Sequence, residues 1–333
     1  MNTVEHFLQN CRRDGSLYVI SEPRFFQHPE EAYDAQYAID KLDVASHLHE
    51  GNALLDLCAE FGHRTSEPSL EIGCGTGRLS LSLLLTGRLS DILLTDPSPS
   101  FCRITERKLA HVSQLRTKYS IAILTAEDMD KIPQQSFSLI VLRSVLHHVL
   151  DVRQFLFDCA RALIPGGLLA FEEPCYEGYL VMGAITQFMP EILACRGVKL
   201  SDKHLSDIQM FAETMRFYAR RDVDKSQCED KHLFRTDELM RICSEYDMRM
   251  EFFPNRVFAD IEDRSKSIAS DHFERFYFDY IKHAMAWDTQ LVEIFEQHAR
   301  EYLAYFAPLV PGGGAPYLFS TFLCQKLGQP AVV

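Results

Sequence analysis

The sequence lacks the cysteine spacings that mark a structural metal site or a disulfide framework. Its ten cysteines are scattered along 333 residues, and no Cys-x-x-Cys pair occurs. Zinc sites and disulfide-rich folds both depend on regular cysteine spacing, so we expect reduced thiols in a cytoplasmic protein. The first residues also lack the basic and then apolar order of a secretory signal, and no apolar run approaches the ~18 residues that cross a bilayer. We therefore expect no membrane span.

Basic residues are in short supply as well. Lys and Arg number 34 against 47 Asp and Glu, which gives a formal net charge of −13. Nucleic-acid binding depends on clustered Lys and Arg that meet phosphates, so the composition argues against a nucleic-acid partner. An acidic field is compatible with a cationic ligand. With 47% hydrophobic residues, the chain can bury a sizeable core, and its length exceeds that of a minimal sheet domain.

The most informative segment that is present spans residues 70–78 and reads LEIGCGTGR. It runs from an apolar stretch with one acid into glycines at 73, 75 and 77, which indicates a strand that ends in a tight turn where the backbone approaches a ligand. A dinucleotide-binding turn has the pattern G-x-G-x-x-G, whose third glycine would fall at position 78. Arg78 occupies that position, so the pattern is not met. The Lys-Ser/Thr pair of a phosphate-binding loop is absent too, because Arg78 and Leu79 follow Gly77.

Strand-like and helical runs alternate from residue 69 to residue 174, which predicts an α/β fold with a doubly wound, mostly parallel sheet. The apolar run 92–95 ends at Asp96. An acid at the end of the second strand of such a sheet is placed to accept hydrogen bonds from both ribose hydroxyls of an adenosine. Alternatively, Asp96 is a turn or helix-cap residue before Pro97 and Ser98.

Together these segments resemble the class I S-adenosylmethionine-dependent methyltransferases, of the broad group that includes ubiquinone and menaquinone biosynthesis enzymes and natural-product tailoring enzymes. The matching stretches, all within residues 70–174, are Glu71-x-Gly-x-Gly-x-Gly, Asp96-Pro97-Ser98, Ala126-Glu127-Asp128-Met129 and Pro165-Gly166-Gly167 with LLAFEEP after it. The resemblance implies a Rossmann-like sheet of seven strands. It also implies S-adenosyl-L-methionine as cofactor and S-adenosyl-L-homocysteine as product.

The resemblance assigns the cofactor site residue by residue. Asp128 would hold the adenine amino group, Met129 would pack on the ring, and Glu71 would take the methionyl ammonium. The assigned set is Glu71, Gly73, Gly75, Gly77, Asp96, Pro97, Ser98, Asp128, Met129 and Arg143. Taken alone, Glu71 also fits a solvent-facing strand acid, and Asp128 fits a solvated acidic loop. Ser138 stands where this family usually has an acid in the fourth strand, which weakens one contact.

The candidate catalytic residues follow the fourth and fifth strands. His147 lies in the string Arg143–Val149, at the edge where substrate should enter, and a histidine titrates near neutrality. A general base is needed only when the nucleophile must lose a proton. Glu173, at the end of the fifth strand, is the second candidate. Both residues also fit structural uses, His147 as a hydrogen-bonded histidine and Glu173 as a packing or capping residue. No metal is expected.

The remaining sequence predicts additions to the core. The predicted segments are an N-terminal helical arm (1–50), the core (51–176), a helical insertion (177–232), the continued core (233–254), a second helical insertion (255–315), and the last strand with a tail (316–333). Within them we expect a helical stretch at 30–47, another helix at 52–60 that leads into the first strand, and an antiparallel last strand at 317–325. Both insertions connect late core elements near the carboxyl ends of the strands, so we expect a lid over the ligand. The aromatic stripe of the second insertion, from Phe273 to Phe306, is expected mainly as helix core, with some members lining a substrate chamber.

These observations favour one function over two alternatives. The favoured function is methyl transfer from S-adenosylmethionine to an oxygen, nitrogen or carbon nucleophile of a small, partly hydrophobic metabolite, in secondary or cofactor biosynthesis. The first alternative is a catalytically silent protein that binds the same nucleoside and acts as a partner or regulator. The second is an NAD(P)-dependent oxidoreductase, which the position of Arg78 opposes.

Overall fold

The computed structural model describes residues 3–24, 43–63, 66–113, 115, 117–261, 271–306 and 316–328. The chain divides into two compact units. The first unit comprises residues 1–173, 236–262 and 321–333, and the second comprises residues 174–235 and 263–320. The segment boundaries expected from the sequence, and the lid role of the insertions, remain predictions.

The first unit is a sheet with helices on its faces. Its strands are β1 (Arg12–Asp14), β2 (Leu17–Val19), β3 (Ser69–Ile72), β4 (Asp91–Asp96), β5 (Lys118–Ile123), β6 (Phe137–Arg143), β7 (Leu163–Pro174), β8 (Met248–Phe253) and β9 (Phe319–Lys326). Its helices are α1 (Thr3–Gln9), α3 (Val44–Glu60), α4 (Arg78–Thr86), α5 (Pro99–Ala110), α6 (Val152–Ala162) and α9 (Thr236–Glu245). Three short 3₁₀ segments, η2 (Ala126–Lys131), η3 (Leu146–His148) and η4 (Phe258–Asp260), join them.

The sheet order is β1-β2-β5-β4-β3-β6-β7-β9-β8. The five central strands are parallel, and β8 pairs antiparallel with β9. This confirms the predicted doubly wound, mostly parallel α/β sheet and its antiparallel last strand. The described sheet has nine strands where seven were expected, because β1 and β2 extend it beyond β5.

The N-terminal arm therefore differs from the helical arm that the sequence predicted. Its described part holds α1, the β1–β2 hairpin and the first turns of α3, and β2 runs parallel to β5 with Tyr18 opposite Ala122. The apolar and aromatic residues of β2 suit a strand that covers a sheet edge. Most of the predicted helical stretch 30–47 lies outside the described residues.

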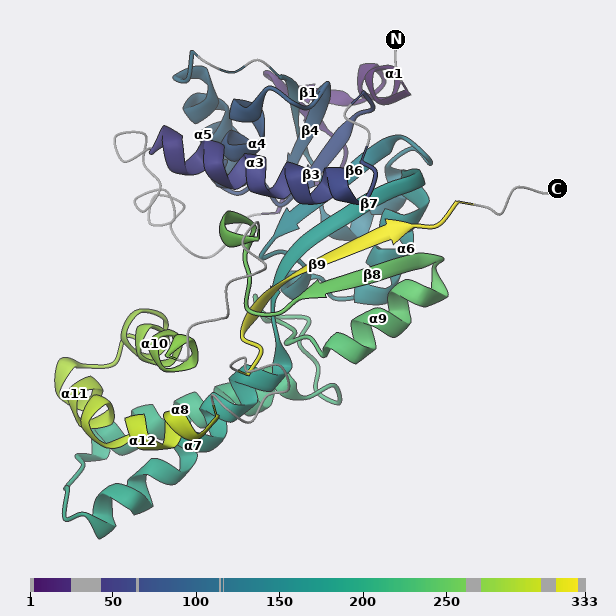
Figure 1. Ribbon diagram of the computed structural model, residues 1–333. Coiled ribbons are helices and arrows are strands. Elements are labelled where there is room, and N and C mark those ends of the chain that lie inside the picture. Colours follow the sequence, from purple (N-terminus) through teal and green to yellow (C-terminus); the bar gives the residue numbers. More distant parts are fainter. Residues whose placement is uncertain are drawn as a thin grey trace. The chain divides into compact units, whose positions relative to one another are not determined.

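Chain direction explains how the helices are shared between the two faces. The connections β3-α4-β4 and β4-α5-β5 run one way along the sheet and β6-α6-β7 runs the other way, so right-handed crossovers put α6 on the face opposite α4 and α5. Figure 1 shows α3, α4 and α5 grouped together. Leu139 and Val141 of β6 belong to the core beneath them, as the two-residue repeat of a strand requires.

Helix α3 runs unbroken where the sequence suggested two helices. The Asp43 carboxylate starts it by accepting hydrogen bonds from the backbone N–H groups of Ala45 (3.1 Å) and Ser46 (3.3 Å). Gly51 lies at its contact with α4, where a Cβ atom would be 2.0 Å from the carbonyl oxygen of Ser82. The two helices can pack at this distance only because residue 51 has no side chain.

The second unit is helical. Its elements are α7 (Tyr176–Cys195), α8 (Asp202–Ala219), α10 (His272–Asp279), the π-helical turn η5 (Tyr280–Ala284), α11 (Thr289–His298) and α12 (Arg300–Phe306). Phe273, Tyr277 and Phe295 of the aromatic stripe are buried in its core with residues of α7 and α8. The Tyr277 hydroxyl lies 2.6 Å from Thr186 Oγ1. These members of the stripe are helix core, which was the main expectation for it.

Among the described helices, α7 alone is long and apolar enough to cross a bilayer, with a mean hydropathy of 1.2. The sequence reading had expected no such segment. Met182, Met189 and Leu193 of α7 are fully buried in the core of the second unit. Burial of this kind is typical of a core helix, which meets the same length and composition criteria.

We expect Gly51→Ala to destabilise the protein, although alanine is the better helix former by about 1 kcal/mol. The added methyl would overlap the Ser82 carbonyl and force α3 and α4 apart. Overpacking of this kind costs about 1–3 kcal/mol. Urea unfolding measures the loss, with His49→Ala as a control at an exposed position of the same helix. A Gly51→Ala protein as stable as the wild type would contradict the packing described here.

Candidate functional site

The predicted glycine turn and Asp96 lie at one edge of the sheet. Strands β3 and β4 are parallel neighbours with Ile72 opposite Thr95, so both end at the same place. The backbone of Gly73, Gly75 and Gly77 has φ values of 69°, 52° and 84°. Side chains rarely adopt this left-handed conformation, which explains the alternate glycines.

The three glycines differ in what surrounds them. A Cβ atom on Gly73 would lie 2.4 Å from Val145 Cγ2, and one on Gly77 would lie 3.0 Å from Thr105 Cγ2. No described heavy atom lies within 4 Å of the corresponding position on Gly75. Protein therefore packs against two sides of the turn, while the backbone at Gly75 faces open space that a ligand can enter.

Asp96 joins the glycine turn to the next helix. Its Oδ2 accepts a hydrogen bond from the N–H of Gly75 and its Oδ1 accepts one from the N–H of Ser98, each at 2.9 Å. The Ser98 hydroxyl in turn accepts from the N–H of Phe101 (3.3 Å) and caps α5, with Pro97 just outside the helix. Asp96 is thus a turn residue here. Each carboxylate oxygen can accept a further hydrogen bond, so its predicted ribose contact stays compatible with this geometry.

Glu71 does not face solvent, so the solvated-acid alternative is wrong. Its side chain lies inside the protein, 2% exposed. Its Oε2 has no hydrogen-bond partner among the described residues. Burial, and to a smaller degree the nearby Asp96 carboxylate, raise the pKa of Glu71 to about 8. Burial therefore favours the protonated form of Glu71, and a cationic group that bound beside it would favour the carboxylate.

The predicted adenine segment follows β5 as the turn η2. Asp128 pairs with Lys131 at 2.9 Å, and the Met129 side chain is fully buried. Arg161 of α6 fixes the segment from behind, because its Nη2 donates to the carbonyl oxygens of Met129 (3.0 Å), Asp130 (2.7 Å) and Ile132 (2.9 Å). The sequence analysis missed Arg161, since a guanidinium bound to distant carbonyls leaves no local pattern.

Arg143 is engaged inside the protein. Its guanidinium contacts Glu50 (2.6 Å) and Glu172 (2.8 Å), which come from α3 and β7. Burial raises the pKa of Glu172 to about 7 against the opposing effect of Arg143. Burial would also raise the pKa of Glu50, but Arg143 and the Ser82 hydroxyl lower it below its ordinary value. Sequence reasoning overlooked both acids. The assignment of Arg143 to the cofactor remains a prediction.

The two catalytic candidates lie together. His147 Nδ1 is 2.6 Å from Glu173 Oε2, and Glu173 is fully buried. The other oxygen of Glu173 accepts hydrogen bonds from the backbone N–H groups of Val145 (2.8 Å) and Leu146 (2.5 Å), which start η3. A carboxylate accepts hydrogen bonds only, so Nδ1 bears the proton and Nε2 is the nitrogen that can take one up.

Ser138 lies away from this edge. It is near the start of β6, with its Oγ 3.4 Å from the carbonyl oxygens of Glu67 and Pro68. Arg143 at the other end of the strand is roughly 16 Å away, from five residues at 3.3 Å each. The absence of an acid at position 138 therefore leaves the carboxyl edge of the sheet unchanged.

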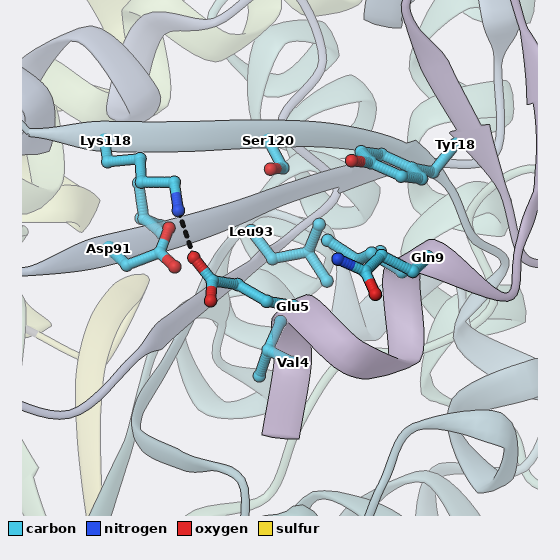
Figure 2. Close-up of a pocket in the computed structure, with 10 residues that line it drawn as sticks. Val4, Glu5, Gln9, Tyr18, Asp91, Leu93, Lys118 and Ser120 are labelled. Atoms are coloured by element: carbon cyan, nitrogen blue, oxygen red, sulfur yellow. Dashed lines mark hydrogen bonds and ion pairs between the residues drawn. The ribbon is translucent and has the colours of Figure 1, made fainter. Parts of the chain in front are cut away.

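A pocket of about 270 Å³ lies at the opposite edge, where β4 and β5 begin (Figure 2). Its lining residues are Val4, Glu5, Leu8, Gln9, Tyr18, Asp91, Ile92, Leu93, Lys118 and Ser120. Glu5 of α1 and Lys118 of β5 form an ion pair across it. None of the predicted site residues lines this pocket, so it is separate from the candidate functional site.

Comparisons with known proteins agree with the motif positions. Residues 70–169 match a family model described as a methyltransferase domain. The chain is 32% identical over 126 residues to the reducing polyketide synthase Preu2 of Preussia isomera, covering 35% of this chain and 5% of that protein. It is 37% identical over 101 residues to a ubiquinone biosynthesis O-methyltransferase of Nitrobacter winogradskyi, covering 30% of this chain and 36% of that protein. The chain thus spans well under half the length of both relatives.

A solved structure from Galdieria sulphuraria, provisionally assigned as a sarcosine dimethylglycine methyltransferase, superimposes with a TM-score of 0.50. The superposition covers 90% of this chain and 98% of that one, at 13% identity. At this identity the likeness concerns the fold alone.

We expect the stability contribution of Glu71 to fall as pH rises. Its pKa is about 8 when folded and 4.5 ordinarily, so between these values the unfolded chain releases the proton that the folded protein retains. The free energy of unfolding therefore falls by up to about 1.4 kcal/mol for each pH unit between these two pKa values. In urea unfolding from pH 5 to pH 8, the free energy of unfolding of Glu71→Gln should rise relative to that of the wild type. Glu67→Gln, at an exposed position, should show a constant difference. Parallel curves for Glu71→Gln and the wild type would refute the buried, protonated acid.

Proposed function

We propose that this chain, whose residues 70–169 are a class I S-adenosylmethionine-dependent methyltransferase domain, transfers a methyl group to a small metabolite with an apolar part. One observation supports this most directly. The open turn at Gly75 lies beside two buried acidic residues, Glu71 and Asp96, and Glu71 has an oxygen without a described partner. That arrangement suits a ligand with an ammonium, a sulfonium and a ribose.

The proposed binding roles follow the strand ends. The backbone of Gly73, Gly75 and Gly77 would lie against the methionyl part. Glu71 would lose its proton when the ligand binds and accept a hydrogen bond from the methionyl ammonium. Asp96 would accept hydrogen bonds from the ribose hydroxyls, beside Pro97 and Ser98. Asp128 would accept a hydrogen bond from the adenine amino group. Met129 is fully buried, so it could pack on the adenine ring only after its neighbours move.

When bound, S-adenosylmethionine supplies an electrophilic methyl group on a sulfonium. The protein then has to hold the acceptor in line with that group and exclude water, which together are worth several kcal/mol. His147 and Glu173 provide the proton step for an acceptor that ionises. Glu173 fixes the ring through Nδ1, so that Nε2 takes the proton from the nucleophile.

The substrate class is inferred from the relatives and the composition. The Nitrobacter winogradskyi relative is a ubiquinone biosynthesis O-methyltransferase, which makes an oxygen acceptor on a partly hydrophobic metabolite the first class to test. We place the reaction in secondary or cofactor biosynthesis and, from the ten free cysteines, in the reducing cytoplasm.

Two observations argue against the alternatives. A silent nucleoside-binding protein would not require a histidine that a buried carboxylate orients, although Glu173 also holds the start of η3. For a nicotinamide enzyme, the turn would need a glycine where α4 already begins at Arg78, with Gly77 as its cap residue.

A thermal shift panel tests the cofactor. S-adenosylmethionine and S-adenosylhomocysteine should both stabilise the protein, by about 2.7 kcal/mol at 100 times the dissociation constant. NAD and NADP should give no shift, because the turn lacks the dinucleotide glycine. Stabilisation by NAD or NADP alone would end the proposal. Methyl-labelled cofactor incubated with metabolite extracts then separates the enzyme from a binder, since only the enzyme labels a small molecule.

We expect His147→Gln to lower turnover by about 100-fold, because proton transfer by a positioned base contributes about 10²–10⁴-fold. The affinity for S-adenosylhomocysteine should remain, since His147 is absent from the proposed cofactor contacts. His148→Gln is the matched control. It changes the neighbouring histidine, whereas the proposed proton step uses the His147 ring that Glu173 holds. Equal turnover in wild type and His147→Gln would return His147 to a structural role.

A further inference from the structure

The N-terminal arm reaches the edge of the sheet where the proposed adenosine site lies. After β2, the backbone N–H groups of Ile20 and Ser21 both donate to the carbonyl oxygen of Ile123, the last residue of β5. The arm thus continues past the end of β5, beside the segment that leads into η2. It lies outside residues 70–169, to which the family model applies.

Ser21 links the arm to the predicted adenine segment. Its side chain is 2% exposed, and its Oγ accepts a hydrogen bond from the N–H of Thr125 at 3.0 Å. Burial would raise the pKa of Asp128, but hydrogen bonds from the Ser21 hydroxyl and from Lys131 hold it below its ordinary value. One buried hydroxyl of the arm therefore accepts a hydrogen bond from the backbone just ahead of η2, and it also favours the ionised form of Asp128.

Arg24 gives the arm a second contact with this region. Its backbone N–H donates to the carbonyl oxygen of Pro97 at 2.9 Å, and its guanidinium lies 3.2 Å from Glu127 Oε2. Pro97 follows the proposed ribose ligand, and Glu127 precedes the proposed adenine ligand. The arm consequently bridges the loops after β4 and β5.

Segment 126–131 depends on such outside contacts for its shape. It is a six-residue 3₁₀ stretch, and Asp128 within it departs from helical geometry with φ −101° and ψ 16°. Arg161 fixes the backbone carbonyls from the α6 side. Ser21 acts from the arm side, by accepting the hydrogen bond of the Thr125 N–H.

We propose that Ser21 is a positioning residue of the cofactor site. Through the N–H of Thr125 it holds the segment that carries Asp128, so that the Asp128 carboxylate can accept a hydrogen bond from the adenine amino group. The N-terminal arm is then part of the machinery that recognises the base. This inference rests on the proposed function. It extends the site to an element that the sequence analysis treated as an addition to the core.

The test compares two ligands by calorimetry, using the full chain. One is S-adenosylhomocysteine, and the other is its analogue with hypoxanthine in place of adenine, which has a carbonyl oxygen where adenine has the amino group. The wild type should prefer the adenine form, because Asp128 accepts from the amino group and would meet an acceptor in the analogue. The variants are Ser21→Ala, Ser21→Thr and Ser69→Ala.

Ser21→Ala should bind S-adenosylhomocysteine about tenfold more weakly, because it leaves the buried N–H of Thr125 without its acceptor and loosens the segment that carries Asp128. Its affinity for the hypoxanthine form should change little, so the preference for adenine shrinks. Ser21→Thr retains the hydroxyl and should recover much of the preference. Ser69→Ala removes a buried hydroxyl at the other end of β3 and should bind as the wild type does.

Other results would overturn the inference. Equal weakening for both ligands would show that Ser21 only supports the fold, and an unchanged preference in Ser21→Ala would show that Asp128 needs no help from the arm. A wild type that binds neither ligand would refute the proposed function together with the inference. A wild type that binds both ligands equally would refute the role of Asp128, and the inference with it, while the proposed function stands.

Discussion

The candidate site depends on the hydrogen bonds that Asp96 makes across the ends of two parallel strands. Its carboxylate accepts from Gly75 on one side and from Ser98 on the other, so one buried side chain sets the distance between the glycine turn and the start of α5. The left-handed backbone of the turn and the cap of the helix both fit this arrangement. Ligand atoms that meet the backbone at Gly75 thereby also come close to a carboxylate.

Sequence patterns were sufficient wherever local chemistry decides the structure. The glycines at 73, 75 and 77 need a backbone that few other residues adopt, and the apolar runs before Asp96 and Arg143 can only be buried strands. The sheet class and the clustering of the strand ends followed from these, whereas the antiparallel last strand was expected from the resemblance to a known fold. The pairing of His147 with Glu173 was within reach, because both were placed at the carboxyl ends of neighbouring strands.

Long-range polar contacts were not predictable in the same way. Glu50 lies 93 residues from Arg143, and Ser21 lies 104 residues from Thr125. Neither spacing has a period, and nothing near Glu50 in sequence sets it apart from a solvated helix acid. The strand character of residues 17–19 was missed for a related reason, since a three-residue strand has too few positions to show alternation and its partner β5 is a hundred residues away.

The adjacency of Glu172 and Glu173 has a consequence for how this chain can vary. Consecutive strand residues point to opposite faces, so one acid serves Arg143 and η4 while its neighbour serves His147 and η3. Inserting or deleting a single residue within the second half of β7 would exchange the faces of both acids at once. Length changes should therefore be confined to the loops that flank this strand, while its interior keeps a fixed count of residues.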